Sequence, residues 1–163
     1  MRKLIVSATL SAVSGALLAG CAAFGPPPAP GEPMSAVQAR LGRPSATFQA
    51  GADTIDEYGA GYFGQYTWMA RYGPDRRLVS YEQVLTDAKF ATVKLGQDTK
   101  QSILLTFGHP AETMTLPRRG LEVWSYRYRQ SGVWDAMMHV HFSSDGIVRE
   151  MMSGPDMLRE KRD

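Results

Sequence analysis

The chain has 163 residues, of which 44% are hydrophobic and 21% are charged, a composition typical of an ordinary globular protein. Without Arg2 and Lys3, its basic side chains fall from 18 to 16, which equals the number of acidic ones. That balance excludes the strongly basic character of many nucleic-acid-binding proteins, so no nucleic-acid partner is expected. A single cysteine excludes an intrachain disulfide, and stability must therefore come from a hydrophobic core.

The first 20 residues have the layout of a secretory signal. Arg2 and Lys3 precede an apolar run at 4–18 that is too short to span a membrane comfortably. The run ends in Leu-Ala-Gly-Cys at 18–21, which resembles the lipobox of bacterial lipoproteins. The resemblance implies cleavage before Cys21 and acylation of that residue. The alternative is an ordinary cleaved signal that leaves a free thiol.

Residues 21–33 are expected to form a lipidated cysteine and a proline-rich tether. Five of the ten prolines lie here, and proline favours an extended conformation. At about 3.1 Å per residue, the tether would hold the folded body roughly 35–40 Å from the lipid surface. Ala22, rather than aspartate, follows the cysteine. By the sorting pattern of enterobacterial lipoproteins, this favours the periplasmic face of the outer membrane, with the inner membrane as the alternative.

Beyond the tether, two stretches of the sequence resemble each other. Val37 and Leu41 correspond to Ile103 and Phe107, and the spacing of four places each pair on one face of a helix. Both stretches continue as Gly-x-Pro. Glycine accepts the left-handed conformation that ends a helix, and proline prevents the helix from resuming. The sequence therefore predicts two tandem units that each contain a helix, with a further short helix near 86–91.

Later segments of both units alternate apolar and polar residues, which is typical of half-buried strands. A shift of 70 residues aligns Tyr72 with Phe142 and Asp75 with Asp145, and both copies continue into a turn. We expect an α+β fold of tandem helix-helix-three-stranded antiparallel meander units, with the helices on one face of the sheet. The expected boundaries are 34–85 for the first unit, 86–153 for the second and 154–163 for a polar tail.

The motifs of the second unit occur in a fixed order along the chain. They are Gly96, Thr99, Ile103, Phe107-Gly108-His109-Pro110, Trp124-Ser125-Tyr126, Phe142 and Asp145-Gly146. This order resembles the SmpA/OmlA (BamE-like) family of outer-membrane lipoproteins, present here as a tandem copy. The Gly96-to-Thr99 spacing is one residue longer than the family pattern. The resemblance implies a part in β-barrel protein assembly or envelope integrity. The tandem also resembles the duplicated architecture of β-lactamase inhibitory protein, which is not an enzyme.

The sequence contains no recognisable catalytic motif, so neither an enzyme nor a cofactor is expected. Aromatic side chains gather at 58–72 and at 124–134. About half of them are expected in the core. Those that stay exposed would anchor a protein interface, as tyrosine and tryptophan commonly do. The candidate partner-binding residues are Tyr62, Phe63, Tyr66 and Trp134.

Two further groups of side chains are candidate sites. Guanidinium groups pair with phosphates, so four arginines are candidates for anionic lipid headgroups, with a solvated surface as the alternative. They are Arg118, Arg119, Arg127 and Arg129. His139 and His141 lie two apart on an expected strand and point to one face. Two histidines are too few for a closed structural metal site, so no metal is predicted and both remain weak candidates.

These expectations favour a non-catalytic bacterial envelope lipoprotein, attached to the membrane by lipid, that docks periplasmic or outer-membrane proteins. One alternative is a periplasmic hydrolase inhibitor resembling β-lactamase inhibitory protein. Another is a lipid-binding or metal-binding sensor that uses the arginines or the histidine pair.

Overall fold

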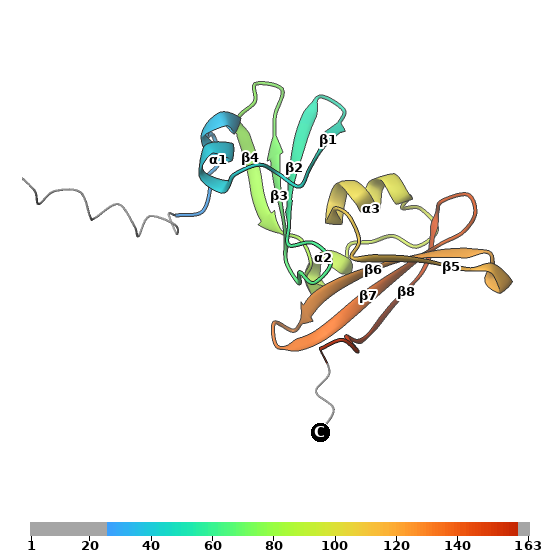
Figure 1. Cartoon of the computed structure of the whole chain (residues 1–163). Coiled ribbons are helices and arrows are strands. Elements are labelled where there is room, and N and C mark those ends of the chain that lie inside the picture. Colours follow the sequence, from blue (N-terminus) through green and yellow to red (C-terminus); the bar gives the residue numbers. More distant parts are fainter. Residues whose placement is uncertain (1–25, 160–163) are drawn as a thin grey trace, which may run out of the picture.

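The computed structural model describes residues 26–159, which form two antiparallel sheets of four strands (Figure 1). The first sheet contains β1 (Ala46–Ala50), β2 (Asp53–Gly59), β3 (Thr67–Tyr72) and β4 (Leu78–Gln83). The second contains β5 (Glu112–Leu116), β6 (Leu121–Gln130), β7 (Trp134–Phe142) and β8 (Val148–Pro155). The helices are α1 (Met34–Leu41), α2 (Asp87–Phe90), α3 (Lys100–Phe107) and the 3-10 turn η1 (Pro117–Arg119). We call α1 to β4 the first unit and α2 to β8 the second.

The ends of α1 and α3 follow from local side-chain chemistry. The Thr99 hydroxyl accepts from the Ser102 N–H, and the Ser102 hydroxyl accepts from the Thr99 N–H, which forms a capping box at the start of α3. Pro33 precedes α1 in an extended conformation, with no side-chain cap. Gly42 and Gly108 end the two helices at φ 85° and 76°, a region that favours glycine.

The two units share their backbone pattern in detail. The register shifts between Arg71 and Tyr72 in β3, and it shifts between His141 and Phe142 in β7. Beyond each shift, Tyr72 pairs with Leu78 and Phe142 pairs with Val148. The alignment of Tyr72 with Phe142 is therefore confirmed. The exact unit boundaries stay predictions.

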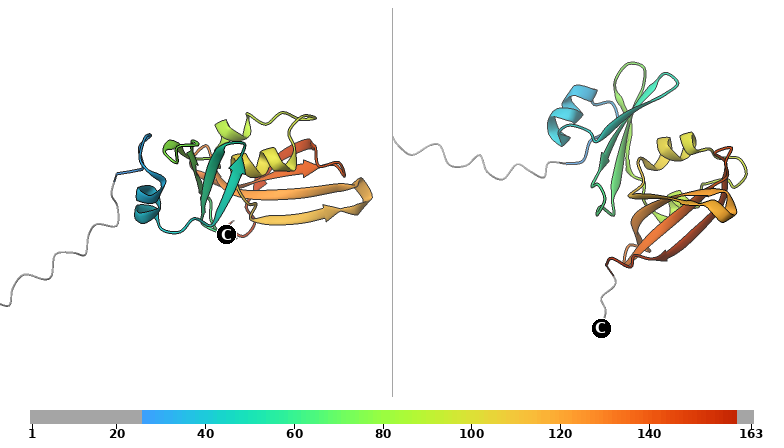
Figure 2. Two further views of the ribbon diagram at one scale, coloured as in Figure 1. Left: turned by 90° about the horizontal axis from the view of Figure 1, so that it is seen from above. Right: turned by 45° about the vertical axis from the view of Figure 1, so that its right-hand side comes forward.

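Helix α3 lies between the two sheets, whereas α1 lies on the outer face of the first sheet (Figure 2). Val37 of α1 packs with Ala70, Tyr72 and Leu78 in a small core. The larger core joins both units: its buried members include Ile55 and Met69 of the first sheet, Phe90 of α2, Ile103 and Phe107 of α3, and Tyr126, Tyr128, Val140, Phe142 and Val148 of the second sheet. The first sheet is thus covered on both faces, and the helices cover only one face of the second.

The expected fold class is wrong. Each sheet has four strands rather than three, and an additional helix, α2, occurs only in the second unit, so the fold is mostly β. The sequence pattern missed β1 and β5, because both are short edge strands in which no residue is buried. Without a buried face, their apolar alternation is weak. The short helix near 86–91 is confirmed as α2, with the Thr86 side chain accepting from the Lys89 N–H.

Several predictions concern residues that the structure does not describe. The signal at 1–20 and the lipidation site Cys21 lie outside the described residues, as does the start of the tether. None of the helices at 26–159 has the length and apolar character that a membrane span requires. The membrane anchor therefore stays a prediction from the sequence.

Candidate protein-binding surface

The connection between β2 and β3, residues 60–66, carries three of the four predicted partner-binding residues. Tyr62, Phe63 and Tyr66 are 47%, 66% and 50% exposed. The rings of Tyr62 and Phe63 meet edge to face, with centroids 4.8 Å apart. Gly61 has a φ of 69°, so the turn needs glycine at that position. The loop thus exposes large aromatic groups that no helix covers.

A buried arginine of the second unit holds this loop. Arg127 of β6 donates from Nη1 to the backbone oxygen of Tyr62 at 2.7 Å, and its guanidinium lies 4.4 Å from the centre of the Tyr62 ring. Its other donors reach Asp156 Oδ2 at 3.1 Å and a carboxylate oxygen of Glu112. The side chains of Arg127 and Asp156 are 1% and 0% exposed. The hydrogen bond from Arg127 lowers the pKa of Glu112. Removing Arg127 would therefore take away the closest cationic partner of the buried Asp156, which keeps only Arg159 at 3.7 Å, and would remove one of the links that hold the loop.

Two more links fasten the loop to the end of the second sheet. Gln65 Nε2 donates to Asp135 Oδ1 at 2.6 Å, and Arg159 Nη2 donates to the backbone oxygen of Phe63 at 2.6 Å. Asp135 also pairs with Arg129 at 2.6 Å. The hydrogen bond from Gln65 and the pairing with Arg129 lower the pKa of Asp135. Figure 1 shows the β2–β3 connection close to the start of β7 and to the C-terminal residues.

These links bring exposed apolar side chains from three segments to one end of the molecule. We call them the aromatic patch: Tyr62, Phe63, Tyr66, Val133, Trp134, Met157 and Leu158, all between 47% and 70% exposed. A groove of about 580 Å³ runs beside Trp134, with Pro155 and Arg159 in its lining. The four predicted residues therefore lie at the same end of the molecule, where Gln65 of the loop binds Asp135, the residue after Trp134. The three loop aromatics do not line the groove beside Trp134. Val133, Met157 and Leu158 were missed, because nothing in their local sequence indicates that they lie at the same end as loop aromatics 67–96 residues away.

A second candidate site lies in a cleft of about 390 Å³ between the units. Glu57 of β2 is 4% exposed, and its Oε2 lies 2.8 Å from Nδ1 of the exposed His109. The same oxygen accepts from the His109 N–H at 3.2 Å. These two contacts join β2 of the first unit to the segment that follows α3 in the second. Sequence reasoning missed Glu57, for which no local motif exists.

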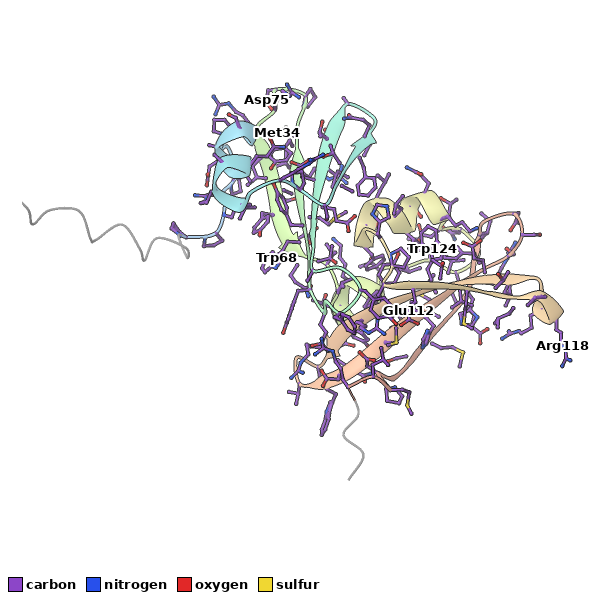
Figure 3. The ribbon with its side chains drawn as sticks, in the orientation of Figure 1. Met34, Trp68, Asp75, Glu112, Arg118 and Trp124 are labelled. Atoms are coloured by element: carbon purple, nitrogen blue, oxygen red, sulfur yellow. The ribbon has the colours of Figure 1, made fainter. Side chains whose placement is uncertain are left out.

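The predicted anionic-lipid arginines do not form one exposed cluster. Arg127 is buried and held by carboxylates, and Arg129 is paired with Asp135. Arg119 pairs with Glu150 at 2.9 Å. Arg118 lies at the tip of the β5–β6 connection, far from Glu112, the carboxylate that holds Arg127 (Figure 3). Arg127 and Arg129 of β6 thus lie away from the pair in η1, and lipid binding by Arg118 and Arg119 stays a prediction.

His139 and His141 lie on the face of the second sheet that no helix covers, opposite the core side chains of Val140 and Phe142. Nδ1 of His139 is 2.8 Å from the Ser125 hydroxyl. Burial and the neighbouring His141 lower the pKa of His139. Within residues 26–159, no group of three or more histidine, cysteine, aspartate or glutamate side chains is placed to hold a metal ion.

Comparisons with known proteins add little. No family model and no curated protein matches the sequence. Among solved structures, the chain is similar to YjgB of Bacillus subtilis, a DUF4309 family protein, at 17% identity. The match covers 75% of this chain and 77% of that chain with a TM-score of 0.33, so it supports no assignment of function. The resemblance to the SmpA/OmlA family stays a prediction.

Proposed function

We propose that this chain is a lipid-anchored bacterial envelope protein that binds a protein partner through the aromatic patch. The observation that carries the proposal is the buried Arg127, which fixes an exposed aromatic loop of one unit onto the other. A loop that is ordered before binding loses little conformational entropy on association. The expected partner presents apolar side chains that enter the groove beside Trp134.

The size of the patch fits an interface anchor. Each large aromatic side chain can bury about 150–250 Å², and a few such residues dominate the energy of most interfaces. Trp134 is 69% exposed at the start of β7, and Phe63 is 66% exposed on the facing loop. Aromatic groups held in this way contribute area without a large entropic cost, since they have few rotatable bonds.

Photo-crosslinking in the native envelope tests whether a protein partner binds the aromatic patch. A photoreactive amino acid at position 63 is compared with one at position 79, because Val79 on β4 is 55% exposed and lies outside the patch. We expect one protein to crosslink at position 63 only. The Trp134→Ala variant should reduce that crosslink, and Val79→Ala should not. Equal crosslinking at both positions would contradict the proposal.

A membrane is the competing ligand for exposed aromatic side chains. Binding of the purified chain to phospholipid vesicles, with and without anionic lipid, separates the two cases. We expect Phe63→Ala to leave vesicle binding unchanged, because the lipid at Cys21 supplies the membrane contact. A loss of vesicle binding in Phe63→Ala would assign the aromatic patch to the bilayer and overturn the protein partner.

The anchor has its own test. We expect Cys21→Ser to move the chain from the membrane fraction to the soluble periplasmic extract and to abolish incorporation of labelled palmitate. Retention of the label in that variant would contradict the lipid attachment at Cys21. This result is independent of the aromatic patch, which lies in a different part of the chain.

A further inference from the structure

The uncovered face of the second sheet carries histidine and methionine side chains together. Antiparallel pairing sets Ser125 of β6, His139 of β7 and Met152 of β8 in one row across the sheet. The next row on the same face contains Val123, His141 and Glu150. We call this surface the open face. Directly opposed residues such as His139 and Met152 have Cβ atoms about 4.5–5.5 Å apart. Diagonal neighbours such as Met152 and His141 lie about 7–8 Å apart, which is still within reach of long or aromatic side chains, so all three side chains can reach a common ligand.

Each of the three potential ligands has a free donor atom. Where Nδ1–H of His139 donates to the Ser125 hydroxyl, Nε2 carries the lone pair. Metal-binding histidines commonly make this second hydrogen bond, which fixes the ring. His141 is 6% exposed, and its Nδ1 has no hydrogen-bond partner; the nearest carboxylate oxygen, on Glu150, is 3.7 Å away. Met152 is 50% exposed, with its thioether available on the same face.

The ligand types decide which ion fits. Mg²⁺ and Ca²⁺ need several oxygen ligands, and a closed zinc site needs four nitrogen, sulfur or carboxylate ligands. Within 26–159 no such group of three or more histidine, cysteine, aspartate or glutamate side chains exists. Thioether sulfur is a soft ligand that selects Cu(I), and imidazole also suits copper. Two imidazoles and one thioether therefore favour Cu(I) over the harder ions.

The face of the first sheet that corresponds to the open face carries different residues. There β3 carries Met69 and Arg71 at the positions of His139 and His141, when the bulges of β3 and β7 are aligned. Met69 is 4% exposed because that face packs into the joint core with α3. The second sheet has histidines where the first has core and ion-pairing residues, and no helix covers them.

We propose that the open face binds a single Cu(I) ion through His139, His141 and Met152. Met137 lies two residues from His139 on the same face and is 7% exposed, which shields the site from water on that side. None of the three ligands belongs to the aromatic patch, although Glu112, which holds Arg127, lies in the same row as Ser125 and His139.

The test is a titration of the full chain with Cu(I) against a chromophoric chelator under anaerobic, reducing conditions. Cys21→Ser is present throughout, so that no thiol competes for the metal. We expect binding of one ion per chain. His139→Ala and Met152→Leu should weaken it by about tenfold or more, and Ser125→Ala by about tenfold through loss of ring orientation.

The chain supplies matched controls. His109→Ala removes the third histidine, which lies in the cleft between the units, and Met157→Leu removes an equally accessible thioether, 70% exposed. Both should bind Cu(I) like the parent chain. Addition of Ag(I), a closed-shell analogue, should shift the NMR signals of the His139 ring and the Met152 methyl group.

Three results would overturn the proposal. They are the absence of saturation at one ion, an equal loss of affinity in the control variants, and Zn(II) binding as tight as Cu(I). Circular dichroism of each variant identifies any loss of affinity that arises from unfolding. A failure of the Cu(I) site leaves the proposed protein partner untouched, because the crosslinking experiment uses other residues.

Discussion

Both units contain a helix followed by a four-stranded antiparallel sheet with a register shift in the third strand, but their surroundings differ. In the first, α1 covers one face of the sheet through Val37, and the other face packs into the joint core through Ile55 and Met69. In the second, α3 covers one face through Ile103 and Phe107, and no helix within 26–159 covers the other. A tandem repeat therefore gives its two sheets different environments, because α3 packs against both sheets and α1 against only one.

The larger share of the core belongs to the second unit. Phe107 is fully buried and stacks on Phe90 with ring centroids 4.8 Å apart, whereas its counterpart Leu41 is only half-buried beside the smaller core. Packing at the α3 position thus stabilises both sheets at once. We expect mutations there to cost more than the same mutations in α1.

The largest difference is expected between Phe107→Ala and Leu41→Ala. Truncating a buried phenylalanine costs about 3–5 kcal/mol of unfolding free energy, and truncating a half-buried leucine about 1–2 kcal/mol. Urea unfolding followed by far-UV circular dichroism measures both values. Equal losses would show that the two helices contribute alike and that the joint core does not depend on α3.

The glycines after the helices provide a closer comparison. Gly42 and Gly108 both have positive φ, so alanine is strained at each by about 1–2 kcal/mol. At Gly42 an added Cβ meets nothing within 4 Å, but at Gly108 it lies 2.7 Å from Cδ of Glu57. We expect Gly108→Ala to cost about 2 kcal/mol more than Gly42→Ala, since Glu57 is buried and must move.

The control for this pair is Gly108→Ala combined with Glu57→Ala. Removing the Glu57 carboxylate should recover part of the difference in unfolding free energy between Gly108→Ala and Gly42→Ala. The close approach of the new Cβ to Glu57 disappears with that side chain. Denaturation midpoints with unchanged slopes would report stability alone. An unchanged difference in the double variant would place the cost in the backbone rather than in the contact between the units.

Methionine oxidation tests the packing of α3 on the first sheet without unfolding the chain. Met152 and Met114 are 50% and 55% exposed on the second sheet, and Met69 is 4% exposed on the first. We expect dilute peroxide to oxidise Met152 and Met114 well before Met69, with buried Met137 also slow. Peptide mass spectrometry over time gives the rates. Rapid oxidation of Met69 would mean that α3 does not stay on the first sheet.

The sequence predicted correctly those elements that depend on residues close together along the chain. The spacing of Val37 and Leu41, the Gly-x-Pro after each helix and the alternation along β7 predicted elements that the structure contains. Alternation also separated Val140 and Phe142 from His139 and His141, which lie on opposite faces of the sheet. Periodicity reports faces well because side-chain direction is set by backbone geometry alone.

The missed features depend on long-range packing. Strands β1 and β5 are stabilised by pairing with β2 and β6 rather than by burial of their own side chains. From the sequence alone, Arg127 is expected to be a surface cation. It is buried because Tyr62 and Asp156, from segments 65 and 29 residues away, accept its hydrogen bonds. Nothing local distinguishes such a residue from Arg118, which is exposed.

The smallest predicted effect is the pH dependence of the link between the units at Asp135. The Gln65 hydrogen bond and Arg129 lower the folded-state pKa of Asp135 below its ordinary value of 3.8, so the unfolded chain binds this proton more readily. The stabilisation is complete above the ordinary pKa and is lost as the pH falls from about 5 towards the lowered folded-state pKa.

Asp135→Asn should therefore flatten the decline of unfolding free energy over this acid range. A steeper decline in Asp135→Asn would reverse the sign of this linkage, and the attachment of the β2–β3 loop would then not depend on the charge of Asp135.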